Sequence, residues 1–228
     1  MCLVLLAWRV WADETLLVAA NRDEYHARPA RSAHRWQGPT RIVAGRDLEA
    51  GGTWLGLDRG GRFAAVTNYR GGREPRAAAS RGALPVAFLS GSDSAAAYAQ
   101  AVAAQGSAYS GFNLLVCDGT ELWWCSNRDH EPRALAPGIY ALGNLLLDSA
   151  DVVEAKAHFR SVLRRAVADE TLFTVLAVYA VRGSAYGTRC ASLVRVHANS
   201  HARFSERTFD AHGNADETVR YEFRLASG

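Results

Sequence analysis

The chain has 228 residues, of which 49% are hydrophobic and 21% charged, so it has the composition of a globular protein that can bury a substantial core. The formal net charge is only +3 and no concentrated basic stripe is present, so we expect no nucleic-acid partner. No segment reaches the roughly 18 apolar residues of a membrane span. Residues 1–12 lack the basic start and cleavage site of a signal peptide, which makes the cytoplasm the expected location.

The cysteine pattern does not indicate a disulfide scaffold or a metal site. The chain contains four cysteines, Cys2, Cys117, Cys125 and Cys190, and they are far apart. They form no CxxC pair and have no histidine at a spacing suited to zinc. We therefore expect free thiols, no metal and no cofactor.

The first predicted element is a β-hairpin at the start of the chain. Residues 3–11 are strongly apolar and predict a buried strand, residues 12–15 predict a turn, and residues 16–20 predict a second short strand. This hairpin would bring the segment Asn21-Arg22-Asp23-Glu24 back beside Cys2.

Cys2 follows the initiator Met1 directly, and removal of Met1 would leave a thiol and a free α-amine on one carbon. The amine has a reference pKa of about 7.7–8.0 and the thiol about 8.5, so the two groups form a base and a nucleophile positioned by covalent geometry. The alternative is that Cys2 is a small buried residue opening a strand. Position alone favours this alternative, and the 21–24 segment is what shifts the balance toward catalysis.

Residues 25–81 predict loops and hairpins. Residues 25–37 have no clean period and predict a loop, whose charges either contact an anionic ligand or are solvated. Residues 42–44 predict a strand, and residues 53–69 predict a hairpin that turns at 58–61, where a glycine pair favours a tight turn. Residues 71–81 are rich in arginine and predict a loop, which is either a surface loop or a lid and anion-binding rim.

The rest of the chain alternates hairpins with helices. Helices are predicted at 84–89 and 92–104, with Ser92 or Asp93 as N-cap, and an amphipathic helix at 148–167 is followed by one at 170–179. Strands are predicted at 111–117, 120–126, 139–142, 189–197, 202–209 and 218–225. We expect a single α+β domain over residues 1–228.

Several short motifs, in one order along the chain, resemble a known family. The matching stretches are Met1-Cys2, Asn21-Arg22-Asp23-Glu24, Gly52-Thr53-Trp54-Leu55-Gly56, Thr67-Asn68-Tyr69-Arg70, Ser80-Arg81-Gly82, Gly111-Phe112-Asn113-Leu114-Leu115, Gly143-Asn144 and Tyr186-Gly187-Thr188-Arg189. The sequence is similar to the NRDE proteins, also called the transport and Golgi organization protein 2 family.

That family resembles the N-terminal-nucleophile hydrolases, nearest to cholylglycine hydrolase and penicillin V acylase. The resemblance implies a four-layer α-β-β-α sandwich with two antiparallel sheets. It also implies that Cys2 is the nucleophile and that Asp23 bonds its amine. Asn68 and Asn144 would donate to an oxyanion, although each is otherwise explained as a turn or strand-end cap.

The cation that supports the thiolate has two candidates. The acylases carry an arginine immediately before the asparagine of this motif, whereas this chain has Ala20 there and Arg22 after it. Residues 20 and 22 share a strand face, so Arg22 is one candidate, and otherwise it is a structural ion-pair partner. Arg189, on a neighbouring strand, is the second.

Asn21, Tyr69 and Arg70 belong to the same motifs and are expected to contact the substrate, whereas Glu24 is expected to be structural. We predict a cysteine hydrolase that cleaves a linear amide bond of a small molecule. The rival hypothesis is a non-catalytic protein of the same fold that binds or carries haem or lipid, with Cys2, His26 or Arg22 contacting the ligand. An acyltransferase using the same thioester is a third hypothesis. The sequence indicates no oligomeric state.

Overall fold

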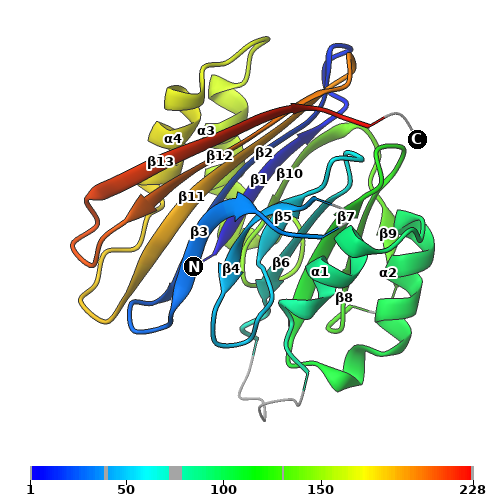
Figure 1. Ribbon diagram of the computed structural model, residues 1–228, viewed down its shortest axis with the longest axis horizontal. Helices are drawn as coiled ribbons and strands as arrows, with labels where there is room; N and C mark the ends of the chain where they lie inside the picture. The colour runs from blue at the N-terminus through cyan, green and yellow to red at the C-terminus, as the bar shows by residue number, and fades with distance from the viewer. Residues whose placement is uncertain (1, 39–40, 72–78, 130, 227–228) are drawn as a thin grey trace.

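The computed structural model describes residues 2–38, 41–71, 79–129 and 131–226, which form two antiparallel β-sheets packed face to face between two pairs of helices (Figure 1). Most of the predicted arginine-rich loop, including Arg73 and Arg76, lies outside the described residues, as does Met1.

The first sheet contains the N-terminal hairpin. Its strand order is β10-β1-β2-β11-β12-β13. The strands are β1 (Leu3–Trp8), β2 (Glu14–Tyr25), β10 (Gly138–Leu142), β11 (Tyr186–His197), β12 (His201–Phe209) and β13 (Ala215–Arg224). Strand β2 continues through residues 21–25, where the sequence predicted only a strand end, because β11 pairs with it along its whole length.

The second sheet has the order β3-β4-β5-β6-β7-β8-β9. Its strands are β3 (Ala30–Arg35), β4 (Val43–Asp47), β5 (Leu55–Leu57), β6 (Phe63–Asn68), β7 (Phe112–Cys117), β8 (Leu122–Ser126) and β9 (Arg133–Ala134). The prediction of a continuous loop over residues 25–37 was wrong, because β3 pairs with β4. Two side chains of the first sheet also bind β3: Glu206 accepts from the Ala33 amide at 2.6 Å and Tyr221 donates to the Ala33 carbonyl at 3.1 Å.

Two helices cover each outer face. Helices α1 (Ala83–Ser90) and α2 (Ala95–Ala104) lie against the second sheet, and α3 (Val153–Val162) and α4 (Asp169–Val178) lie against the first. The N-cap of α2 is Ser94, whose hydroxyl accepts from the Ala97 amide, and not Ser92 or Asp93. The helix predicted over 148–167 is shorter, because Asp148 has a left-handed φ of 57° before it begins and Leu163 has an extended ψ of 119° where it ends.

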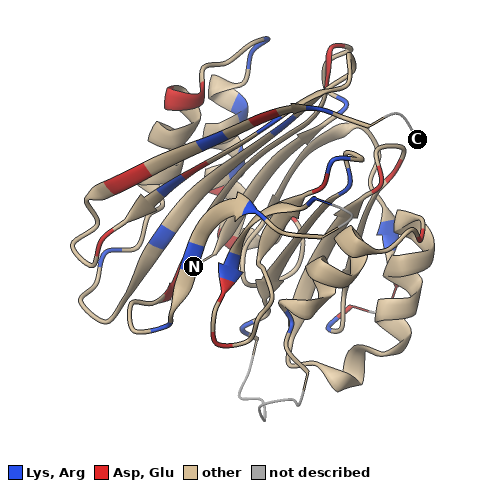
Figure 2. Ribbon diagram, viewed as in Figure 1, with Lys and Arg blue, Asp and Glu red and all other residues tan. Residues whose placement is uncertain are grey.

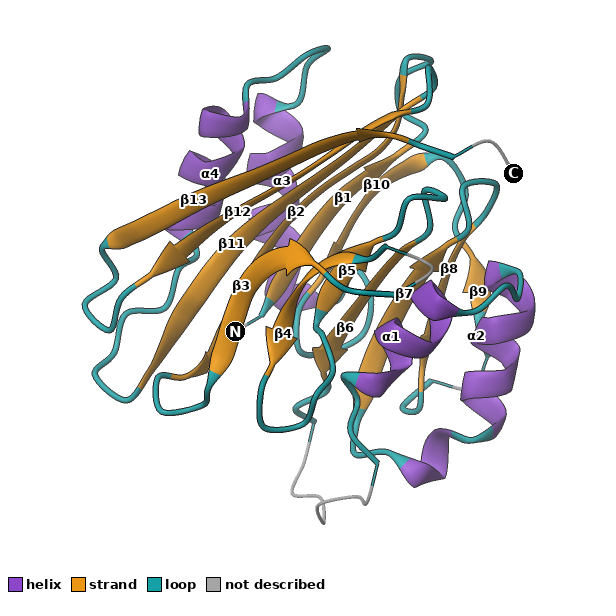
Figure 3. Ribbon diagram, in the orientation of Figure 1, coloured by secondary structure: helices purple, strands orange, loops and turns teal. Residues whose placement is uncertain are grey.

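Figure 3 colours the helices and strands that make up the four layers. Three apolar clusters hold these layers together. The inter-sheet cluster contains Phe63, Trp124 and Phe204, and the outer clusters pack helices onto each sheet. The α-β-β-α sandwich is therefore confirmed. None of the helices within the described ranges is both long and apolar enough to cross a membrane.

The end of the inter-sheet core positions the site. Leu16, Val18 and Ala20 alternate along β2 and all belong to the inter-sheet cluster. Arg22 follows two residues later, so it continues the same face of the strand. The apolar core thus gives way to charged residues at the end of the sandwich where the chain begins, and Figure 2 shows basic and acidic positions close together on the strands beside the N-terminus.

Candidate active site

Cys2 lies directly before β1, beside the continuing end of β2. Leu3 pairs with Asn21, which confirms that the hairpin brings the 21–24 segment beside Cys2. The thiol of Cys2 donates to the backbone carbonyl of Asp23 at 3.5 Å. All four cysteines are free, but Cys117, Cys125 and Cys190 are buried whereas Cys2 is only half-buried.

Asn144 joins Cys2 to the second sheet. Its Oδ1 accepts from the backbone nitrogen of Cys2 at 3.1 Å, and its Nδ2 donates to the backbone carbonyl of Asn68 at 2.7 Å. Its own carbonyl accepts from the Arg70 amide at 2.8 Å. Asn144 is 4% exposed, so these bonds fix the nucleophile candidate between the ends of β10 and β6.

The Asp23 side chain is buried and is held by β11. The Thr188 hydroxyl donates to Asp23 Oδ1 at 2.6 Å and accepts from the Val181 amide at 2.8 Å. The Asp23 carbonyl also accepts from the Tyr186 hydroxyl at 3.1 Å. Sequence analysis missed Tyr186 and Thr188 as site residues, although both stand in a matching motif in which only Arg189 received a role.

The electrostatic setting of Cys2 contains opposing influences. Burial raises the pKa of the Cys2 thiol, and the Asp23 carboxylate adds to this rise. The backbone of Asp23 and the guanidinium of Arg22 lower the pKa, and burial outweighs them. Arg22 therefore has the sign that a thiolate-supporting cation needs.

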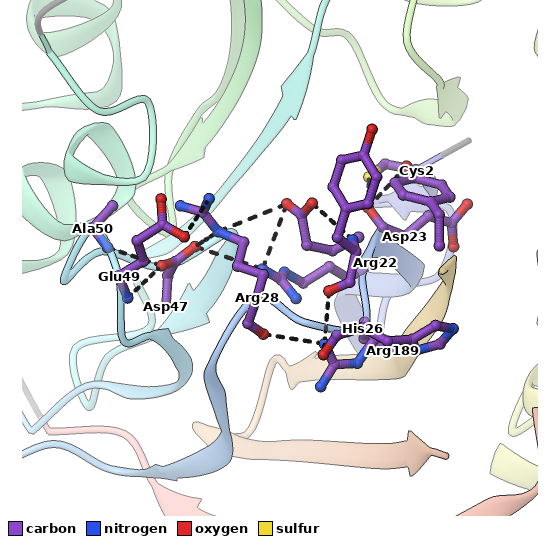
Figure 4. A network of polar contacts seen from close by, with 12 residues as sticks. Cys2, Arg22, Asp23, His26, Arg28, Asp47, Glu49, Ala50 and Arg189 are labelled. Carbon is purple, nitrogen blue, oxygen red and sulfur yellow. Dashed lines mark hydrogen bonds and ion pairs between the residues drawn. The ribbon is translucent and has the colours of Figure 1, made fainter. Parts of the chain in front are cut away.

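Arg22 lies between the two sheets and is only 7% exposed. Its guanidinium is 4.4 Å from the centre of the Trp54 ring, and its Nη2 lies 3.6 Å from Asp47 and 3.8 Å from Glu24. Arg28 continues this network, with Nε 2.6 Å from Asp47, as Figure 4 shows. Arg22 and Arg28 are thus both already paired with carboxylates.

An open cavity of about 1130 Å³ contains the candidate residues. Those that line it are Cys2, Arg22, Asp23, Asn68, Tyr69 and Arg70. Further lining comes from both sheets and from the segment before α1 and includes Glu24, Tyr25, Arg28, Asp47, Glu49, Trp54, Arg81 and Tyr186. The cavity is therefore rich in charge at its walls and has Cys2 in its lining.

Two candidates point elsewhere. Arg189 does not line the cavity, and its Nη1 donates to the carbonyls of Tyr25, His26 and Arg28 at 3.0–3.2 Å, so it holds the β2–β3 turn (Figure 4). Asn21 donates to the carbonyl of Leu176 in α4 at 2.8 Å, on the opposite face of β2 from Arg22. The structure therefore does not bring Arg189 or Asn21 into the cavity that Cys2 lines.

The rival hypothesis of haem or lipid binding also named His26 as a possible ligand contact. The His26 ring lies 2.9 Å from the carbonyl of Gly183 and is not among the cavity residues. Within the described part of the chain, no three His, Cys, Asp or Glu side chains are grouped so that they can hold a metal ion.

Two solved hydrolases share this fold. The chain superposes on the Caenorhabditis elegans N-acylethanolamine-hydrolyzing acid amidase orthologue with a TM-score of 0.57 and 12% identity, covering 84% of this chain and 92% of that one. It also superposes on the C2A mutant of the Clostridium perfringens conjugated bile acid hydrolase with a TM-score of 0.50 and 10% identity, covering 99% of this chain and 98% of that one. At these identities the likeness defines the fold class.

The sequence comparisons then define the family. The sequence model of the Transport and Golgi organisation 2 family matches residues 1–181. The bovine and human Transport and Golgi organization protein 2 homologues are 34% and 33% identical over 257 aligned positions, which cover 93% of this chain and 93% of each homologue. The chain belongs to this family, as the ordered motifs predicted.

Proposed function

We propose that the chain is an amide hydrolase in which Cys2, exposed as the first residue by removal of Met1, is the nucleophile. The observation that carries this proposal is the half-buried Cys2, which lines the cavity while its backbone nitrogen bonds to Asn144 and its thiol to Asp23. The shared fold supports it, because one similar solved structure is named an acid amidase and another a conjugated bile acid hydrolase.

The reaction uses the amine and thiol of one residue. The α-amine takes the thiol proton as Sγ attacks the carbonyl carbon, and a tetrahedral oxyanion forms. The C–N bond then breaks, the protonated amine gives its proton to the leaving nitrogen, and a thioester remains on Cys2. Water, deprotonated by the same amine, attacks the thioester, so the acid leaves and the thiol is restored.

The neighbouring residues have separate tasks in this mechanism. Asn144 Oδ1 fixes the direction of the amine, and Asp23, held by Thr188, provides the negative charge beside it. Arg22 lowers the pKa of the Cys2 thiol. Two side chains donate to the oxyanion. One is Asn68, which lines the cavity. The other is Asn144, which uses one N–H of Nδ2 for the Asn68 carbonyl and has its second N–H for the oxyanion.

The test combines mass spectrometry with turnover. Intact mass of the purified native protein is expected to show loss of Met1, because the base is otherwise an amide nitrogen. Cys2→Ala is expected to abolish amine release from N-acyl substrates, whereas Cys117→Ala, which removes a thiol from the inter-sheet core, keeps it. Retained Met1 in active protein, or unchanged turnover in Cys2→Ala, contradicts the mechanism.

A further inference from the structure

Arg70 differs in its partners from Arg22 and Arg28, which also line the cavity. It follows β6, and its Nη2 donates to the Tyr186 hydroxyl at 2.6 Å. Arg22 and Arg28 each lie within ion-pair distance of Asp47, but no carboxylate of the described residues forms an ion pair with Arg70. Its guanidinium therefore brings positive charge to the cavity that no acidic side chain within the described ranges offsets by direct contact.

The partner of Arg70 does not neutralise it. Burial raises the pKa of Tyr186 to about 12, so the phenol is uncharged at neutral pH. Burial lowers the pKa of Arg70, but the Tyr186 contact and the charges of Cys2 and Asp23 outweigh it and hold that pKa above its usual value. Arg70 is thus cationic and is oriented by a neutral hydroxyl.

Arg70 is also close to the reacting thiol. The hydroxyl that accepts from Arg70 donates at 3.1 Å to the Asp23 carbonyl, and the same carbonyl accepts the Cys2 thiol at 3.5 Å. Three consecutive contacts therefore connect the guanidinium to Sγ, and Arg70, Tyr186 and Cys2 all line one cavity. An anionic group held by Arg70 therefore lies in the same cavity as a carbonyl placed at Cys2.

We propose that Arg70 is the anion-binding residue of this site and that the substrates are small, hydrophilic amides with a carboxylate near the scissile bond. A guanidinium presents several N–H donors in a planar fork that matches a carboxylate, and only one nitrogen is committed to Tyr186. The inference deepens the proposed function and rests on it only in taking Cys2 as the reacting atom.

The charged walls of the cavity agree with a hydrophilic substrate. Carboxylates and guanidinium groups also line this cavity, and a lipid chain lying along them would have to cover Glu24, Asp47 and Arg28. Burying such charges under apolar groups is unfavourable. A polar molecule that carries its own charge avoids this penalty.

Alkylation of Cys2 by two small probes tests the anion site without knowledge of the substrate. Iodoacetate and iodoacetamide both alkylate the thiolate, forming an S–C bond as iodide leaves, but only iodoacetate is anionic. Peptide mass spectrometry gives the rate constant of each probe at Cys2. We expect the ratio of the iodoacetate rate constant to the iodoacetamide rate constant to fall about tenfold in Arg70→Gln, the size of one charge-assisted hydrogen bond. Arg70→Lys, which keeps the charge, should retain most of the ratio.

Arg31→Gln is the matched control, because Arg31 is exposed on β3 and does not line the cavity. It should leave the ratio unchanged. Tyr186→Phe should lower it part of the way, since Arg70 loses its orienting hydroxyl. An equal ratio in wild type and Arg70→Gln, or an equal fall in Arg31→Gln, overturns the proposal.

Protection of the thiol extends the test to amides. N-acetylglycine should slow alkylation of Cys2 by iodoacetamide, N-acetylglycinamide should not, and Arg70→Gln should abolish the difference. Equal protection by the two compounds overturns the proposal. Neither experiment needs turnover, so the anion site can fail while hydrolysis stands, and hydrolysis can fail while the anion site stands.

Discussion

The backbone nitrogen of Cys2 and the side chain of Asn144 form the link between the start of the chain and the second sheet. Asn144 Oδ1 accepts from Cys2 while its Nδ2 donates to the Asn68 carbonyl, so one amide group spans both sheets. A terminal residue is normally among the least ordered parts of a chain. Here two hydrogen bonds of one buried side chain hold it at the cavity.

Asn144→Ala should therefore impair both stability and activity. We expect unfolding free energy to fall by about 1–3 kcal/mol, because buried partners are left unpaired. Turnover should fall about a hundredfold, since the amine and thiol lose their direction. Asn127→Ala is the matched control, because Asn127 also bridges buried backbone groups but lies outside the cavity. Denaturant melts and turnover assays should show that it loses stability and keeps activity; equal activity loss in both variants contradicts the prediction.

Thr188 is expected to act through Asp23. Thr188→Val removes the hydroxyl that donates to Asp23 Oδ1 and leaves a side chain of similar shape. We expect kcat to fall while KM stays near its wild-type value, because Thr188 does not line the cavity. Thr188→Ser restores the hydroxyl and should restore kcat. A change in KM alone, or failure of the serine variant to restore kcat, would show that Thr188 has only a packing role.

The strand pattern of β2 shows how much the sequence predicts. Leu16, Val18 and Ala20 alternate, and the same period places Arg22 at the cavity and Asn21 on the opposite face toward α4. The period of two therefore already predicted that the Asn21 side chain points away from the cavity. The expectation that Asn21 contacts the substrate came from the family motif instead. The fold class and the approach of residues 21–24 to Cys2 followed from local patterns and the family resemblance.

The remaining site residues depend on contacts that no local pattern encodes. The pairing of β11 with β2 shifts register between Thr188 and Cys190, so the alternation that would place Arg189 is interrupted there. Tyr186 reaches Asp23 across 163 positions of sequence. Such a contact exists only after the two strands have paired, which explains why the motif alone did not distinguish Tyr186 from Arg189.

Arg22 should set the pH at which Cys2 becomes reactive. Burial raises the pKa of the thiol and Arg22 lowers it, so Arg22→Gln should move the pKa further up. The thiolate is the reactive form, and the pH midpoint of Cys2 alkylation by iodoacetamide should rise accordingly. Arg22→Lys should shift the midpoint less, because it keeps the positive charge. An unchanged or lower midpoint in Arg22→Gln contradicts this account.

Glu206 should make stability depend on pH in a direction unusual for a carboxylate. Burial raises the pKa of Glu206 above the ordinary 4.5. The hydrogen bonds to Ala33 and Ser192 and the charge of Arg22 lower this pKa, but burial outweighs them. The folded state therefore holds the proton more tightly than the unfolded state, so this contribution is fully present below the unfolded pKa and is lost as pH rises through the folded pKa.

Glu206→Gln isolates this effect, because glutamine keeps an oxygen that can accept from the Ala33 amide. Unfolding free energy should be measured by denaturant titration from pH 4 upward in both proteins. The difference between them cancels the other titrating groups, and wild type should lose stability relative to Glu206→Gln as the pH rises. A difference that stays constant, or that changes in favour of wild type, would show that Glu206 is ionised in the folded state without a raised pKa.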